Sequence, residues 1–106
     1  MSLLIIYTTF PSSAEAETIA KALVESRLVA CANIMAPHKA FYWWDGKVQN
    51  GTETAVIFKT RAELFEKAKE KILELHSYDT PCIVAWPIEK GHEAFLQWIE
   101  AETKVS

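Results

Sequence analysis

The order of sequence patterns predicts an α+β fold, a split β-α-β sandwich in which a long hairpin separates two strand-and-helix units and one extra helix follows at the end. Three observations support this prediction. An Asp-Gly pair stands in the middle of a long strand-forming stretch, helix-like apolar stripes lie on both sides of that stretch, and short apolar runs begin and end the pattern. We therefore expect the sheet order 4-1-3-2, with both main helices on one face.

The long hairpin is predicted for residues 28–60. Asp45-Gly46 supplies the positive φ angles that a two-residue turn needs, and strand-forming residues flank it on both sides. Each arm of about fifteen residues spans roughly 50 Å, whereas a fourteen-residue helix covers only about 21 Å. The helices of this chain are therefore too short to cover the hairpin.

Four consecutive aromatic residues stand in the outer half of this hairpin: Phe41, Tyr42, Trp43 and Trp44. Consecutive strand residues point to opposite faces, so these aromatic side chains occupy both faces. A soluble monomer rarely leaves such a patch in water. We expect another subunit to cover it.

The remaining elements follow in order along the chain. Residues 2–9 predict a buried strand, and Ser12 with Glu15 has the spacing of a capping box before a helix that ends at about residue 26. Thr60 and Glu63 repeat that spacing before a second helix. Its expected apolar side is formed by Leu64, Phe65, Ala68, Ile72 and Leu75.

The last part of the chain predicts an edge strand and a third helix. Pro81 lies near the start of the strand at residues 80–86, and proline cannot donate a hydrogen bond to a neighbouring strand. Gly91 then leads into a helix with an apolar side. The runs 3–6, 55–58 and 82–86 are apolar at every position, so both faces of the sheet are expected to be buried, the second one against other subunits.

Composition narrows the class of protein. A chain of 106 residues with a 50% hydrophobic fraction fits one domain, expected over residues 1–106. The net charge of −3 comes without a cluster of Lys or Arg, which argues against nucleic acid and anionic membranes as partners. The apolar run at residues 3–6 is far too short to span a bilayer. We expect a cytoplasmic protein whose two cysteines remain thiols.

Several motifs occur in one order over nearly the whole chain: LVACAN at 28–33, FYWWDGK at 41–47, FKT at 58–60, HSYDTP at 76–81 and LQWI at 96–99. Together they resemble the CutA family of divalent-cation tolerance proteins. The resemblance implies a ferredoxin-like subunit, a compact cytoplasmic homotrimer, and association with copper and other divalent cations. The sequence departs from the family pattern at Ser77, at Cys82 and over residues 49–52.

The family motifs fall on Cys31 and His76, which are the candidate metal ligands. Thiol and imidazole groups favour copper over zinc and magnesium. The expected sheet order does not bring the two residues together in one subunit, so a neighbouring subunit would supply one of them. Cys31 is alternatively a small buried hydrophobic residue, and Cys82 is expected in the core. The sequence has no motif typical of a preformed metal cage.

The family pattern also falls on Tyr42, Trp44, Lys59 and Tyr78. These side chains combine aromatic walls with a cation, as a small-molecule cleft would. Tyr42 and Trp44 alternatively pack against a neighbouring subunit. Lys59 lies within an apolar strand, which suggests that its amine reaches solvent or meets an acidic group.

The sequence is compatible with two classes of function. No nucleophile elbow, Walker loop or dinucleotide-binding turn is present, so we expect a protein that is not an enzyme. One class is a metal-binding tolerance protein. The alternative is a trimeric small-molecule sensor that resembles the PII signalling proteins.

Overall fold

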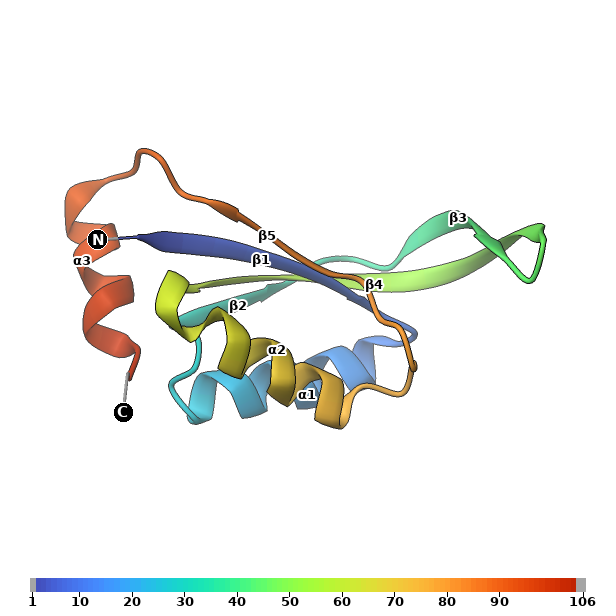
Figure 1. Cartoon of the computed structure of the whole chain (residues 1–106), viewed down its shortest axis with the longest axis horizontal. Coiled ribbons are helices and arrows are strands. Elements are labelled where there is room, and N and C mark those ends of the chain that lie inside the picture. The colour runs from blue at the N-terminus through green and yellow to red at the C-terminus, as the bar shows by residue number, and fades with distance from the viewer. Residues whose placement is uncertain (1, 105–106) are drawn as a thin grey trace.

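The computed structural model describes residues 2–104, which form one antiparallel sheet with helices against it (Figure 1). The elements in chain order are β1 (Leu3–Phe10), α1 (Ser13–Glu25), β2 (Cys31–Ile34), β3 (His38–Trp44), β4 (Lys47–Arg61), the 3-10 turn η1 (Ala62–Leu64), α2 (Phe65–Leu75), β5 (Ile83–Pro87) and α3 (Glu93–Glu102). The predicted α+β order of elements is confirmed.

Strand β4 is the longest strand among the described residues and organises the sheet. The strands lie in the order β2-β4-β1-β5, and β3 pairs with the outer half of β4. β2 and β3 together form the first arm of the predicted hairpin, so this order is the expected 4-1-3-2. As Figure 1 shows, β3 and the outer half of β4 extend beyond the helices.

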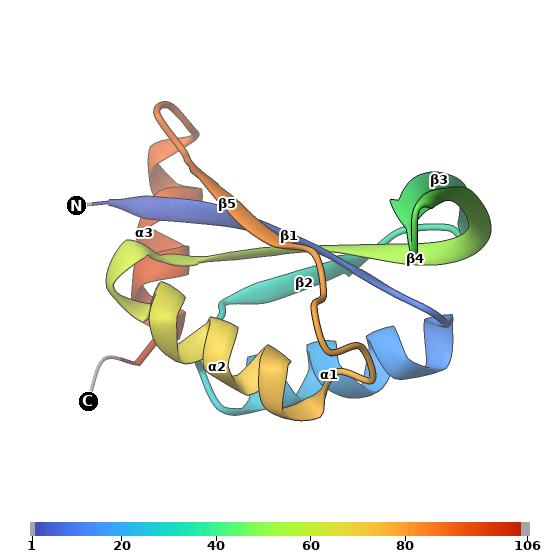
Figure 2. The same cartoon turned by 45° about the vertical axis from the view of Figure 1, so that its right-hand side comes forward.

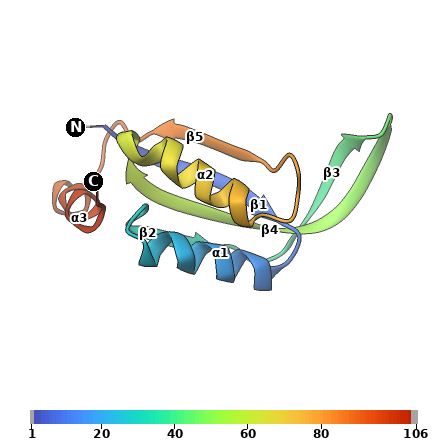
Figure 3. The same cartoon turned by 60° about the horizontal axis from the view of Figure 1, so that its bottom comes forward.

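The hairpin turns at the predicted pair. Asp45 and Gly46 both have positive φ, 53° and 72°, as a tight two-residue turn of this kind requires. The first arm is interrupted between β2 and β3, next to Pro37, while Met35 still donates its backbone N–H to the carbonyl of Ala55. The interruption lets the outer hairpin bend away from the sheet (Figure 3).

Helices α1 and α2 cover one face of the sheet, and α3 lies at the end opposite the hairpin (Figures 1 and 2). The main core lies between the sheet and the first two helices. Its buried residues include Ile6, Phe10, Ile19, Leu23, Val56, Phe58, Ala68 and Ile72. A smaller cluster of Leu3, Ala30 and Ile99 joins α3 to the second face of the sheet.

Helix capping follows the prediction at one helix and not at the other. Ser12 Oγ accepts the backbone N–H of Glu15 at 3.1 Å, as predicted. The second predicted capping box was wrong. Thr60 belongs to β4, and its hydroxyl donates at 2.6 Å to the carbonyl of Leu28, which lies in the connection between α1 and β2, so it does not cap α2. α2 begins later, without a side-chain cap.

Two further element predictions need correction. The last strand begins at Ile83 rather than at residue 80, because Pro81 and its neighbours form the approach to the strand. The predicted edge position of this strand is confirmed. Leu75 is exposed, because it lies in the last turn of α2, where the helix ends at His76.

The second face of the sheet is largely uncovered in the single chain. The register places Cys31, Lys59, Ile5 and Trp86 in one row across the strands, and Asn33, Ile57, Tyr7 and Val84 in the next. Val84 and Trp86 on the edge strand are 49% and 45% exposed. No helix in residues 2–104 is long and apolar enough to cross a membrane.

Candidate functional site

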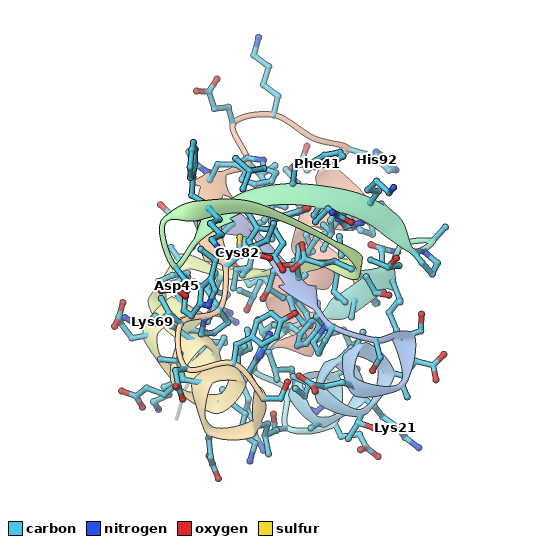
Figure 4. The ribbon with its side chains drawn as sticks, turned by 90° about the vertical axis from the view of Figure 1, so that its right-hand side faces the viewer. Lys21, Phe41, Asp45, Lys69, Cys82 and His92 are labelled. Atoms are coloured by element: carbon cyan, nitrogen blue, oxygen red, sulfur yellow. The ribbon has the colours of Figure 1, made fainter. Side chains whose placement is uncertain are left out.

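A cleft of about 680 Å³ lies between the outer hairpin and the segment that leads into β5. Figure 4 looks onto this end of the molecule, with Cys82 labelled near the hairpin ribbon. The lining residues come from three parts of the chain: Thr9 from β1, Ala40, Phe41, Tyr42, Trp43, Trp44 and Glu53 from the hairpin, and Ser77, Tyr78, Asp79, Thr80 and Cys82 from the segment before β5.

Three of the four residues predicted for a ligand cleft line this cavity. They are Tyr42, Trp44 and Tyr78. Tyr42 and Tyr78 are both partly exposed, so their rings are accessible from the cleft. The structure therefore brings together two distant sequence segments, the hairpin and the segment after α2, that carry the predicted aromatic walls.

Lys59 does not line the cleft. It lies on the uncovered second face of the sheet, opposite Cys31 in the register, and its Nζ donates to Asn33 Oδ1 at 2.7 Å. The amine is thus satisfied by a neutral amide rather than by an acidic group. Its position inside an apolar strand is explained by this cross-strand hydrogen bond.

Cys31 is half-buried next to Lys59. Burial raises the pKa of the Cys31 thiol above its ordinary value of 9.0, and the positive charge of Lys59 offsets part of that rise. The protonated thiol is therefore the resting form at neutral pH. A metal ion at Cys31 would have to displace that proton.

His76 is buried and uses both ring nitrogens for hydrogen bonds within the chain. Nδ1 accepts the backbone N–H of Tyr78 at 3.0 Å, so Nε2 carries the proton and donates it to the carbonyl of Thr9 at 2.8 Å. The ring also stacks on Phe10, with the ring centres 4.8 Å apart. This arrangement explains how a histidine in a connecting segment comes to be buried.

His76 in turn positions the cleft wall. Its ring lies 4.9 Å from the ring of Tyr78, centre to centre, in addition to the hydrogen bond from the Tyr78 backbone. The next residue along, Ser77, donates its backbone N–H and its hydroxyl to Glu15 Oε2 at 3.1 and 3.0 Å. These contacts fix the segment after α2 against the start of α1.

The prediction that Cys82 belongs to the core was wrong. Cys82 is exposed and lines the cleft, because it precedes β5 instead of lying within the sheet. Partial burial in the cleft raises the pKa of its thiol, and the negative charge of Glu53 raises it further. Sequence reasoning placed Cys82 inside a strand that in fact begins one residue later.

The two predicted metal ligands lie on opposite faces of the sheet. Cys31 shares a row with Lys59 and Ile5 on the second face, whereas His76 stacks on Phe10 in the main core. Within residues 2–104 no group of three or more His, Cys, Asp or Glu side chains could hold a metal ion. Ligation by Cys31 and His76 stays a prediction, and at His76 it would require the loss of one of the two hydrogen bonds.

Sequence reasoning missed Glu53 as a cleft residue, although a signal was present. A turn at Asp45-Gly46 pairs Trp44 with Lys47, and counting outward pairs His38 with Glu53. Residues 38, 42 and 44 therefore share a face with Glu53, since every second strand residue points to the same side. Its approach to Tyr78 and Cys82 depends on the tertiary fold.

Comparison with known proteins supports the resemblance seen in the motifs. The family model described as "CutA1 divalent ion tolerance protein" matches residues 4–102. The "Divalent-cation tolerance protein CutA" of Archaeoglobus fulgidus is 53% identical over 95 residues, which are 90% of this chain and 92% of the relative. The protein of the same name from Pyrococcus horikoshii is 46% identical over 102 residues, 96% of this chain and 99% of the relative.

Solved structures are similar over the same range. CutA1 from Oryza sativa has a TM-score of 0.97 at 33% identity, covering 100% of this chain and 97% of that one. A structure from Archaeoglobus fulgidus, described as a periplasmic divalent cation tolerance protein CutA, has a TM-score of 0.93 at 49% identity, covering 96% and 99%.

The sheet order, the two helices on one face and the long hairpin define a ferredoxin-like α+β subunit with a cleft at the hairpin. The chain belongs to the CutA1 family of divalent ion tolerance proteins, since the family model covers nearly all of the residues that form this subunit.

Proposed function

We propose that this chain is a cytoplasmic divalent-cation tolerance protein that works as a homotrimer, binds copper and is not an enzyme. The observation that carries the proposal is the family match over residues 4–102, because the relatives with the same fold are named for divalent-cation tolerance. Assembly and copper binding go beyond those names and rest on the exposed apolar surface and on Cys31. The non-enzymatic role and the cytoplasmic location rest on the sequence patterns.

Assembly is supported by the apolar surface that the single chain leaves open. Phe41, Trp43 and Trp44 at the hairpin tip are 70%, 75% and 66% exposed. The second face of the sheet adds Val84 and Trp86. Soluble monomers rarely expose large apolar patches, so copies of this chain are the proposed cover of both surfaces.

Copper binding is supported most directly by Cys31. Its sulfur is a soft ligand on the face where subunits are proposed to meet, and affinity for nitrogen and sulfur ligands peaks at copper among the divalent first-row metals. His76 is the second proposed ligand, and it joins only if one of its two ring hydrogen bonds, to Thr9 or from Tyr78, is released.

Calorimetric titration of the reduced protein with copper tests this proposal. Cys31→Ser is expected to weaken copper binding markedly, whereas Cys82→Ser, which removes the other thiol, serves as the matched control. If Cys31→Ser and His76→Ala both bind copper like the parent, these two residues are structural and the assignment fails.

A trimeric small-molecule sensor is the second candidate, and the cleft is the observation that favours it. Its volume of about 680 Å³ lies within the range of about 300 to 1,000 Å³ typical of ligand pockets. A thermal-shift screen with copper, zinc, mercury, nucleotides and small acids separates the two candidates. A metal-only response supports tolerance, and a ligand-only response supports a sensor.

A further inference from the structure

We propose that the cleft between the hairpin and the segment before β5 binds a small organic ammonium ion. This inference concerns a ligand class that is separate from divalent metals. It rests on the chemistry of the cleft walls, and it stands whether or not copper binds at Cys31.

The walls of the cleft suit a soft cation. Tyr42 and Tyr78 line it from two segments of the chain, both are partly exposed, and neither belongs to the group of tip residues proposed to pack against another copy. Aromatic faces attract ammonium groups through their negative quadrupole, and the attraction grows when the cation loses water. The cleft is also large enough to hold a ligand of several heavy atoms.

The charge in the cleft has one sign. Among the described residues that line it, the charged side chains are Glu53 and Asp79, and both are acidic. The field of Glu53 reaches Cys82, another lining residue. Burial is the main cause of the raised pKa of the Cys82 thiol, and the Glu53 carboxylate adds to that rise. A cation in this space would meet a negative potential from more than one side.

A lysine amine in the cleft would favour an acidic ligand, but Lys59 lies elsewhere. Its amine donates to Asn33 on the second face of the sheet and does not line the cleft. Without that amine, an anion in the cleft would meet two carboxylates and no compensating cation among the described lining residues. Aromatic rings and carboxylates together therefore select a positively charged organic group over an acid of the same size.

Choline and 3,3-dimethyl-1-butanol provide a sharp test, because they have nearly the same shape and differ in charge. The intact protein is titrated with each at constant ionic strength, followed by tryptophan fluorescence and by NMR shifts of the cleft residues. We expect saturable binding of choline that is at least about tenfold tighter than binding of the neutral alcohol. Equal binding of the two would mean that the cleft selects shape alone, which overturns the proposal.

Variants assign the effect to the cleft. Glu53→Gln is expected to weaken choline binding about tenfold, and Tyr78→Leu should also weaken it. Glu89→Gln removes an exposed charge away from the cleft and is expected to bind like the parent. Circular dichroism checks that each variant is folded. If Tyr78→Leu unfolds, Tyr78→Phe is used in its place. Tyr78→Phe keeps the aromatic ring and should retain choline binding. The proposal fails if Glu53→Gln binds like the parent, or if a neighbouring subunit fills the cleft and the parent does not bind choline.

Discussion

At the scale of single residues, His76 joins the core to the cleft. Its ring stacks on Phe10, donates to the Thr9 carbonyl and accepts from the Tyr78 backbone. Each contact involves a buried polar or aromatic group, and a buried polar group without a partner costs free energy. One side chain thus connects the end of β1 with the wall of the cleft.

His76→Ala is therefore expected to lower the free energy of unfolding by about 2 to 4 kcal/mol, because it leaves a cavity and two unpaired backbone groups. His76→Phe keeps the ring volume and loses only the hydrogen bonds, so its loss should be smaller. Urea unfolding at one fixed protein concentration measures both. A variant His76→Ala as stable as the parent would contradict the structural role.

Three groups predict how stability changes in alkaline solution. The pKa values of Cys31, Cys82 and Tyr78 are raised above their ordinary values of 9.0, 9.0 and 10.0, each mainly through burial. The folded chain keeps these protons to higher pH than the unfolded chain does. The contribution of these groups to the free energy of unfolding is therefore fully present below about pH 9, and it is lost as the pH rises through the raised pKa values.

Urea midpoints measured from about pH 8 to about pH 10.5 test this sign. The parent should lose stability over that interval. The double variant Cys31→Ala with Cys82→Ala should lose less, because two of the three groups no longer titrate. An identical pH profile for the parent and the double variant would refute the contribution of the thiols.

At the scale of elements, local chemistry could be predicted best. The Asp45-Gly46 turn fixed the hairpin and its register, and Ser12 fixed the start of α1. Prediction from the sequence failed where a contact with a distant segment determines what a residue does. Thr60 looks like a helix cap by spacing, yet it bonds to the Leu28 carbonyl, which lies 32 positions away in the chain.

The same distinction applies to the candidate site. Aromatic residues of the hairpin could be assigned to one face by counting from the turn. Their meeting with Tyr78 could not be predicted, because the contacts of His76 with β1 decide where the segment after α2 lies. Lys59 lies outside this cleft, and the sequence did not show that its amine donates to the neutral amide of Asn33 on the adjacent strand.

Gly46→Ala tests the turn at this scale. A Cβ at Gly46 would meet nothing within 4 Å, so the cost comes only from the positive φ of 72°. We expect a loss of about 1 to 2 kcal/mol in the free energy of unfolding. Gly51→Ala is the matched control, because its Cβ would lie 3.7 Å from the Tyr42 hydroxyl, an ordinary contact without positive φ. Equal effects of the two variants would show that the turn strain is not the cause.

At the scale of the whole molecule, the apolar surface of the single chain is the main unexplained feature. The molecule measures 44 × 26 × 22 Å, and the hairpin with its exposed aromatic tip accounts for much of its length. The second face of the sheet is covered by α3 only at one end. Both surfaces are explained together if copies of the chain pack against one another.

Trp44→Ala probes that packing. Trp44 is 66% exposed in the single chain, so truncation there would change stability little if the chain stayed monomeric. Burial against a neighbour would instead make the loss about 3 to 5 kcal/mol, as is typical for a buried tryptophan. Thermal unfolding of the parent and the variant at equal concentration separates the two cases, and an unchanged melting temperature would show that Trp44 stays in water.

The molar mass in solution tests assembly most directly. Light scattering on a sizing column at micromolar concentration should give a mass near three times the 12.0 kDa of one chain. That result is expected because the hairpin tip and the second sheet face both need an apolar cover. A mass near 12.0 kDa would contradict the assembly and leave those surfaces exposed to water.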